Sequence, residues 1–326
     1  MRPRLLPDTH LLPSDQGVVI RGPRHTAAFP RPGIYPWLER IRPFLDGDTD
    51  LDRLVAELPP QAAEHVRTLV ELLVREGFVR DAEGDLPHGL TPEIRARHSA
   101  LIDFIALRAD SPEHRFERYR NCAPMVIGSG RMGSALVLAL LTSGVEHVRF
   151  GVVEANGGGS RTDMARLEEC VALIRGDGRS FRYEALDGAP SGLPADASVA
   201  VLATDEFDAE LTMRVRAIAM RPDLVHGHAV ASGRHAYIRT LSPDSDSQSL
   251  DDPGMGIPDR RWAEAVDPAD RYLGGPVAAL AANQLCLQLL EHIAQLDHTE
   301  GGVGTPADRQ AVLDLATGRF LTVRAT

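Results

Sequence analysis

The first eighty residues alternate short apolar stretches with turn residues and then change to helical spacing. Three strand-length stretches, 9–12, 17–20 and 25–29, are separated by turns rich in Pro, Gly, Ser and Asp. Three segments with apolar residues at helical spacing follow: 35–45, 51–58, and a third between the Pro59-Pro60 pair and Gly77. This order of elements, βββααα, predicts a winged-helix-like module over residues 1–82.

The pattern changes again further along the chain. Residues 83–120 mix Pro, Gly and charged residues with one helical segment at 92–108, which indicates a linker and a bracing helix. Strand-length apolar stretches then alternate with helical segments; the expected strands are 124–128, 148–153, 198–203 and 319–323, and the expected helices are 133–143, 163–174, 206–219 and 276–295. Such alternation is typical of an α/β domain with helices on both faces of a parallel sheet. We therefore expect a doubly wound, Rossmann-type domain over residues 121–326, with a surface loop at 244–259.

A glycine-rich loop stands between the first expected strand and helix of this domain. Gly128, Gly130 and Gly133 have the G-x-G-x-x-G spacing that lets backbone N–H groups approach a phosphate at the positive end of a helix. Glu154 ends the next expected strand, where a carboxylate is placed to bind ribose hydroxyls. The loop predicts a site for ATP or a dinucleotide, although the same glycines are also used for close strand–helix packing alone.

The amino-acid composition argues against several kinds of reaction, binding site and partner. All 35 basic residues are arginine, so reactions that need a lysine are excluded, and the formal charge of −11 argues against nonspecific nucleic-acid binding. The three cysteines lie far apart, which suggests neither a zinc site nor a disulfide framework. No apolar run approaches the length of a membrane span. We expect a cytoplasmic protein with no membrane segment.

The second domain resembles the ThiF-type superfamily, which includes ubiquitin-activating enzymes and the adenylating enzymes of sulfur-carrier activation. The resemblance rests on residues 126–134, Glu154, Arg161 and the Ala-Thr-Asp sequence ending at Asp205. In that family the acidic residue holds ribose, the arginine and a downstream lysine hold the triphosphate, and the aspartate holds magnesium. This chain has no lysine, and Tyr237 and Thr240 stand where many relatives have zinc-binding cysteines. The resemblance thus implies a degenerate, noncatalytic member with a vestigial nucleotide site and no zinc.

The first domain resembles the RiPP precursor recognition element, a PqqD-like winged helix. The resemblance rests on residues 4–10, 17–22, 45–47 and 75–79. Fused to a ThiF-like domain, this element occurs in partner proteins of YcaO cyclodehydratases, which form azolines from Cys, Ser and Thr in thiopeptides and related products. The resemblance implies that a precursor's leader region adds as a strand to the third strand and packs against the third helix. The implied contact residues are Thr26, Ala27, Ala28, Phe29, Arg67 and Val70.

Several alternatives stay open. An NAD(P)-dependent oxidoreductase or an NAD-sensing winged-helix repressor would also use the glycine loop, and homodimerisation is possible for this fold. An active adenylating enzyme would require Arg175 or Arg179 in place of the missing lysine. His226, His228 and His235 lack a metal-site spacing, and the sequence favours a turn around the first two. Asp205 is also placed to cap the helix that follows it.

Overall fold

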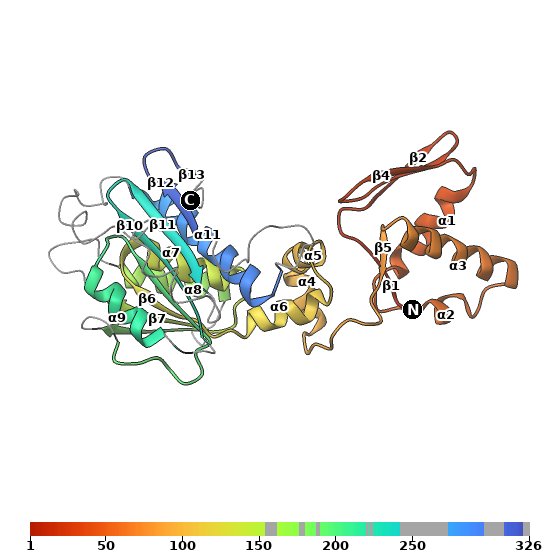
Figure 1. Cartoon of the computed structure of the whole chain (residues 1–326). Coiled ribbons are helices and arrows are strands. Elements are labelled where there is room, and N and C mark those ends of the chain that lie inside the picture. The colour runs from red at the N-terminus through yellow and green to blue at the C-terminus, as the bar shows by residue number, and fades with distance from the viewer. Residues whose placement is uncertain are drawn as a thin grey trace. The chain divides into compact units, whose positions relative to one another are not determined.

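A computed structural model describes residues 1–153, 162–175, 180–186, 190–219, 221, 224–241, 273–296 and 310–321. The chain divides into two compact units, Met1–Glu117 and Arg118–Thr326 (Figure 1). The first unit thus includes most of the segment expected to be a linker. Within the described residues, no helix has the length and apolar character needed to cross a membrane.

The first unit has the expected order of three strands and three helices. Strands β2 (His10–Ser14), β3 (Gly17–Arg21) and β4 (Thr26–Phe29) form an antiparallel sheet in the order β2-β3-β4. Helices α1 (Ile34–Ile41), α2 (Leu51–Val55) and α3 (Pro60–Arg75) follow. Two further strands, β1 (Pro3–Leu5) and β5 (Val79–Asp81), pair antiparallel. Each has only three residues, too few for a visible alternation of apolar and polar positions.

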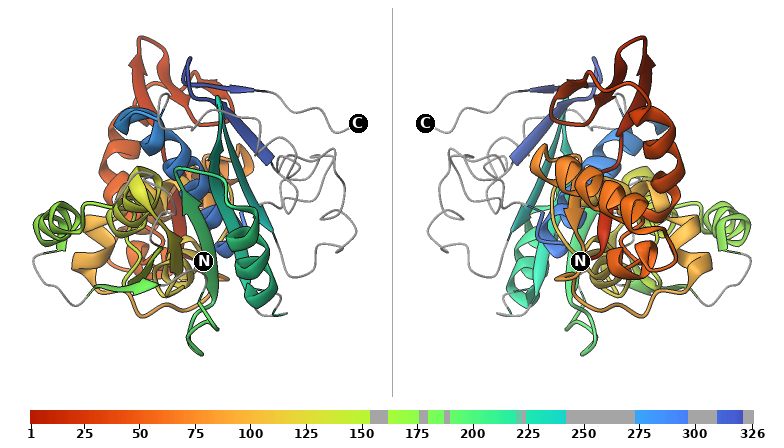
Figure 2. Two further views of the ribbon diagram at one scale, coloured as in Figure 1. Left: turned by 90° about the vertical axis from the view of Figure 1, so that its left-hand side faces the viewer. Right: turned by 90° about the vertical axis from the view of Figure 1, so that its right-hand side faces the viewer.

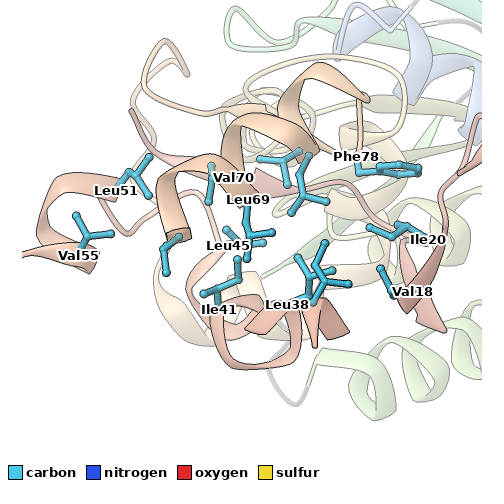
Figure 3. Packing of buried hydrophobic residues seen from close by; sticks show 14 of the residues in the cluster. Val18, Ile20, Leu38, Ile41, Leu45, Leu51, Val55, Leu69, Val70 and Phe78 are labelled. Carbon is cyan, nitrogen blue, oxygen red and sulfur yellow. The ribbon is translucent and has the colours of Figure 1, made fainter. Parts of the chain in front are cut away.

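The core of the first unit is formed by one face of β3 and the apolar stripes of the helices (Figure 3). Val18 and Ile20 of β3 are about as buried as Leu69 and Val70 of α3, with at most 1% of each side chain exposed. Helix α1 ends earlier than the expected 35–45, because Pro43 lies in a short 3-10 helix (Arg42–Phe44) that replaces its last turn.

Residues that follow β5 extend this unit. They form α4 (Pro92–Arg97), α5 (Ser99–Ala106) and α6 (Pro112–Arg120), so the helix expected at 92–108 is in fact interrupted at His98. Arg4 of β1 donates through Nη1 to Glu113 Oε2 of α6 over 2.8 Å, with both side chains largely buried. This ion pair joins the first strand to α6, and residues 83–117 are therefore part of a packed structure.

The second unit contains an eight-stranded mixed sheet in the order β13-β12-β11-β10-β9-β6-β7-β8. Its parallel part is β6 (Met125–Gly128), β7 (Val148–Val153), β8 (Phe181–Leu186), β9 (Val199–Thr204) and β10 (Val225–Ser232). The antiparallel extension is β11 (His235–Leu241), β12 (Gln310–Asp314) and β13 (Arg319–Leu321). The parallel doubly wound arrangement is confirmed, and β13 lies within the strand expected at 319–323, whereas β8, β10, β11 and β12 were not predicted.

Helices lie on both faces of this sheet, as Figure 2 shows for α9 (Ala209–Ala219) and α11 (Gly275–Ile293). Helix α7 (Gly130–Thr142) packs against α11, β9 and α8 (Met164–Arg175). The chain leaves β6 and β9 in opposite directions along the sheet, so these neighbours form the point where strand order reverses. Doubly wound proteins bind ligands at the carboxyl ends of such strands.

Candidate functional site

The glycine loop lies at this point, and each glycine has a packing reason to be there. A Cβ atom on Gly128 would stand 1.8 Å from the carbonyl oxygen of Ala203, in β9. Gly130 has φ of +72°, and a Cβ there would lie 2.3 Å from Asp205 Oδ2. A Cβ on Gly133 would come within 2.9 Å of the Phe150 ring. The strand, the helix and the next strand therefore need these glycines even without a ligand.

Asp205 occupies the position where a phosphate would meet the positive end of α7. Its Oδ2 accepts a hydrogen bond from the Arg131 N–H and its Oδ1 accepts one from the Met132 N–H, both over 2.8 Å. The side chain is buried, with the residue 2% exposed. Because the first amides of a helix have no partner within the helix, they attract an anion, and here the anion is the protein's own carboxylate.

The neighbouring amides also have partners. Gly130 donates to Thr162 Oγ1 over 2.8 Å, and Ser129 donates to the Ala203 carbonyl over 3.2 Å. Four consecutive N–H groups, from Ser129 to Met132, thus donate to acceptors of the protein. A bound phosphate would have to displace Asp205 and Thr162 from this loop and would face the negative charge of the carboxylate.

The sequence allowed two roles for Asp205, a ligand-holding residue or the cap of the helix that follows it. The structure does not show the second role. Helix α9, which follows it, is capped by Asp208, whose Oδ1 accepts from the Leu211 N–H over 2.9 Å. The interpretation of Asp205 as the cap of the next helix is therefore wrong; it stabilises the start of α7. Thr162 was missed, because a single hydroxyl residue distant in sequence from the loop gives no recognisable motif.

Arginine does not replace the missing lysine at the position of Arg175. This residue ends α8, and its guanidinium donates to the carbonyl oxygen of Val145, just beyond the carboxyl end of α7. A helix of 13 residues is about 20 Å long, so Arg175 lies far from the glycine loop. Glu154, Arg161 and Arg179 lie outside the described residues, as does the loop expected at 244–259.

Tyr237 and Thr240, which stand where many relatives have zinc-binding cysteines, lie in β11. Tyr237 pairs with Val230 of β10, while Thr240 donates to Gln288 Oε1 of α11 over 3.2 Å. No group of three or more His, Cys, Asp or Glu side chains is arranged for a metal ion within the described ranges. His226 and His228 lie inside β10, so the prediction of a turn at these residues is wrong.

A second candidate site is the free edge of β4 in the first unit. Among the described strands β4 pairs only with β3. Gly22 donates to the His25 carbonyl over 2.9 Å, which makes these two residues a hydrogen-bonded pair next to the ladder. Hydrogen-bonded and non-bonded pairs alternate in antiparallel sheets. The backbone groups of Ala27 and Phe29 therefore face β3, and those of Thr26 and Ala28 face the open edge.

Aromatic packing fixes β4 against the end of α3. Phe78, which follows that helix, is completely buried and contacts both Phe29, edge to face at 6.4 Å, and the ring of His25, stacked at 4.5 Å. Phe29 itself is half-buried, as is Ala27, while Thr26 and Ala28 are exposed. The edge thus offers free backbone groups from a strand that is held firmly on its inner side.

The two α3 residues expected to line a peptide groove have different surroundings. Val70 is completely buried in the core of the first unit, as Figure 3 shows, and has no exposed surface for a ligand. Arg67 is partly exposed and donates to Asp52 Oδ1 of α2 over 3.0 Å. Exposed ion pairs of this kind contribute little to stability.

Comparison with known proteins identifies the architecture. No protein-family model matches the sequence, and no curated protein matches it. Among solved structures, E. coli MccB with MccA-N7isoASN aligns with a TM-score of 0.59 at 12% identity, covering 98% of this chain and 96% of that chain. PaaA aligns with a TM-score of 0.62 at 14% identity, covering 96% and 97%. E. coli MccB with ATP gives 0.58 at 11% identity, covering 98% and 96%. The chain therefore has a ThiF-like α/β fold.

Proposed function

We propose that this protein binds the leader region of a ribosomally made precursor peptide and presents it to a YcaO-type cyclodehydratase. The observation that carries the proposal is the open edge of β4 in a winged-helix-like unit joined to a ThiF-like unit. An extended peptide can add to such an edge through backbone hydrogen bonds, while neighbouring side chains select its sequence. The likeness of the fold to the microcin C7 biosynthetic enzyme MccB, solved in complex with N-formylated MccA, supports a role in biosynthesis.

The same proposal assigns no catalysis to this chain. The nucleotide loop of the ThiF-like unit is filled by Asp205 and Thr162, and the sequence contains no lysine to bind a triphosphate. ATP consumption and azoline formation then belong to the cyclodehydratase. Binding of the leader here raises the effective concentration of the core peptide at the partner's active site.

The edge of β4 is tested with Ala28→Pro. Proline removes the Ala28 N–H that faces the open edge, and it leaves the hydrogen bonds to β3 in place, as expected at an edge strand. Ala28→Val is the matched control, because it keeps the N–H at the same exposed position. With fluorescent leader peptides encoded beside the protein's own gene, we expect Ala28→Pro to weaken binding about tenfold and Ala28→Val to bind like the wild type.

Titrations with other ligands distinguish leader binding from the alternative functions. A DNA duplex, NADH and ATP serve as ligands in parallel titrations of the wild-type protein. Leader binding that is equal in both variants would remove the edge of β4 from the proposal. Absence of leader binding together with clear binding of NADH or of DNA would replace the proposal with an oxidoreductase or a repressor.

A further inference from the structure

Strand β8 forms one edge of the eight-stranded sheet in the second unit. Among the described strands it pairs only with β7, to which it runs parallel. The Val148 N–H of β7 donates to the Ser180 carbonyl over 2.9 Å, so the backbone groups of every second residue from Ser180 onwards face β7. The backbone groups of three residues face the open edge instead: Phe181, Tyr183 and Ala185.

The side chains of β8 divide between the two faces of the sheet. Tyr183 is about half exposed and lies on the face that α8 covers, where its hydroxyl hydrogen-bonds with a glutamate of that helix. Arg182 and Glu184 lie on the other face, and both are exposed. Neither forms an ion pair within the described part of the chain. Arg182 acts electrostatically on Asp196, but the carboxylate of Asp196 accepts its hydrogen bond from Arg149 of β7.

A second copy of this chain can pair with the open edge about a twofold axis. In an antiparallel pair, residues whose backbone groups face outward must lie opposite one another. At least two outward-facing residues of each copy pair in three symmetric registers, which are centred on Arg182, Tyr183 or Glu184.

The charges of β8 favour one of these registers. Centring the pair on Arg182 places that arginine opposite the same arginine of the other copy, and centring it on Glu184 does the same with the glutamate. Like charges that lie directly opposite each other destabilise a sheet. Centring the pair on Tyr183 instead places Arg182 of each copy opposite Glu184 of the other, and it pairs all three outward-facing residues. The sequence of β8, FRYEAL, is thus self-complementary in this register.

We propose that two copies of this chain associate edge to edge through β8, antiparallel about a twofold axis at Tyr183. Backbone hydrogen bonds join the two sheets, and two Arg182–Glu184 pairs set the register. Charged residues on an edge strand usually prevent such pairing, but here the two charges lie opposite each other in the dimer. Because the contact is small, we expect a weak dimer whose population depends on concentration. The proposal is independent of leader binding at β4, which concerns the first unit.

The test is sedimentation velocity of the full chain at concentrations up to about 1 mM, which detects weak dimers. Arg182→Glu makes both charged positions of β8 acidic, and Glu184→Arg makes both basic. Each variant alone should dimerise at least about tenfold more weakly than the wild type, because both pairs then join like charges. An equal mixture of the two variants should form a heterodimer about as stable as the wild-type dimer, since opposite charges face each other again.

A control on another element shows whether net charge alone matters. Arg214→Glu makes the same charge change on α9, which packs against β9 and β10, and it should dimerise like the wild type. A wild type that stays monomeric at the highest concentration would overturn the proposal. So would a dimer that both β8 variants leave unchanged, because it would use another surface. A mixture of the two variants that forms no heterodimer would overturn it as well.

Discussion

Asp205 decides what the glycine loop does. Its carboxylate accepts two backbone hydrogen bonds at the start of α7 while being almost completely buried. Asp205→Ala removes both acceptors and leaves the buried N–H of Met132 and the partly buried N–H of Arg131 without the carboxylate. We expect the free energy of unfolding of the second unit to fall by about 3 kcal/mol, measured by urea denaturation with hydrogen exchange in α7.

The matched control is Asp208→Ala. Asp208 is exposed, and its carboxylate accepts from the Leu211 N–H at the start of α9. An exposed N-cap contributes about 1 kcal/mol. Equal losses in the two variants would mean that burial of Asp205 adds nothing, and the anion-site interpretation of its position would then be wrong.

Nucleotide binding gives a second prediction for the same residue. If the carboxylate fills the phosphate position, ATP should leave the thermal stability of the wild type unchanged, and inorganic phosphate should stabilise Asp205→Ala more than the wild type. A wild type that ATP stabilises, with the effect lost in Asp205→Ala, would instead show that Asp205 assists nucleotide binding. Thermal melts with each ligand distinguish the two results.

The position of the glycine loop could be predicted from the sequence, but not which group accepts the hydrogen bonds of its N–H groups. The spacing of Gly128, Gly130 and Gly133 was sufficient to place a loop between a strand and a helix, because that spacing is a local property. It could not show that Asp205, more than seventy residues away, supplies the anion. Local spacing also could not show that Val70 belongs to the core, since an apolar residue on a helix suits either a core or a groove.

At the scale of elements, the apolar pattern predicted most strands made of apolar residues and missed several that carry polar or charged side chains. Strands β6 and β9 are completely buried and have continuous apolar runs, and β7 has a run in which only Arg149 is charged. Strand β8 is exposed along most of its length, and its sequence FRYEAL has no apolar run. Strands β10 and β11 were missed because β10 contains two histidines and β11 contains an arginine, so polar residues on one face hid the strands.

One ion pair in this extension predicts how stability depends on pH. The Arg234 guanidinium donates to both carboxylate oxygens of Asp314, over 3.0 and 2.7 Å. The N–H groups of Ala316 and Thr317 also donate to this carboxylate, at Oδ1. These contacts hold the pKa of the Asp314 carboxyl well below its usual range. A lowered folded pKa gives stability that is complete above the unfolded pKa of about 4 and is lost as pH falls below it.

Asp314→Asn tests this dependence. We expect the variant to unfold at lower urea concentration than the wild type at pH 7, because it lacks the charged pair at the junction of β12 and β13. The difference between the two midpoints should shrink as pH falls from 4 towards 2, because the carboxyl of the unfolded wild type takes up a proton over this range while that of the folded protein stays charged. A difference that is constant over this range would show that charge has no part in it.

At the scale of the whole molecule, the two units have separate hydrophobic cores. Substitutions in different cores without shared contacts usually have independent effects. Asp205→Ala in the second unit should therefore leave leader affinity unchanged, while Ala28→Pro should leave the thermal stability of α7 unchanged. Loss of leader binding in Asp205→Ala would show that the peptide site needs both units.

Turnover by the cyclodehydratase provides the last prediction. If the protein acts by holding the leader, Ala28→Pro changes how much precursor is bound and leaves the partner's active site as it was. KM for the full precursor should then rise about tenfold with kcat nearly constant. A core peptide without its leader gains nothing from this protein, so its slow conversion should be equal with the wild type and Ala28→Pro. A fall in kcat with unchanged KM would instead place the protein in the chemical step, and the noncatalytic assignment would fail.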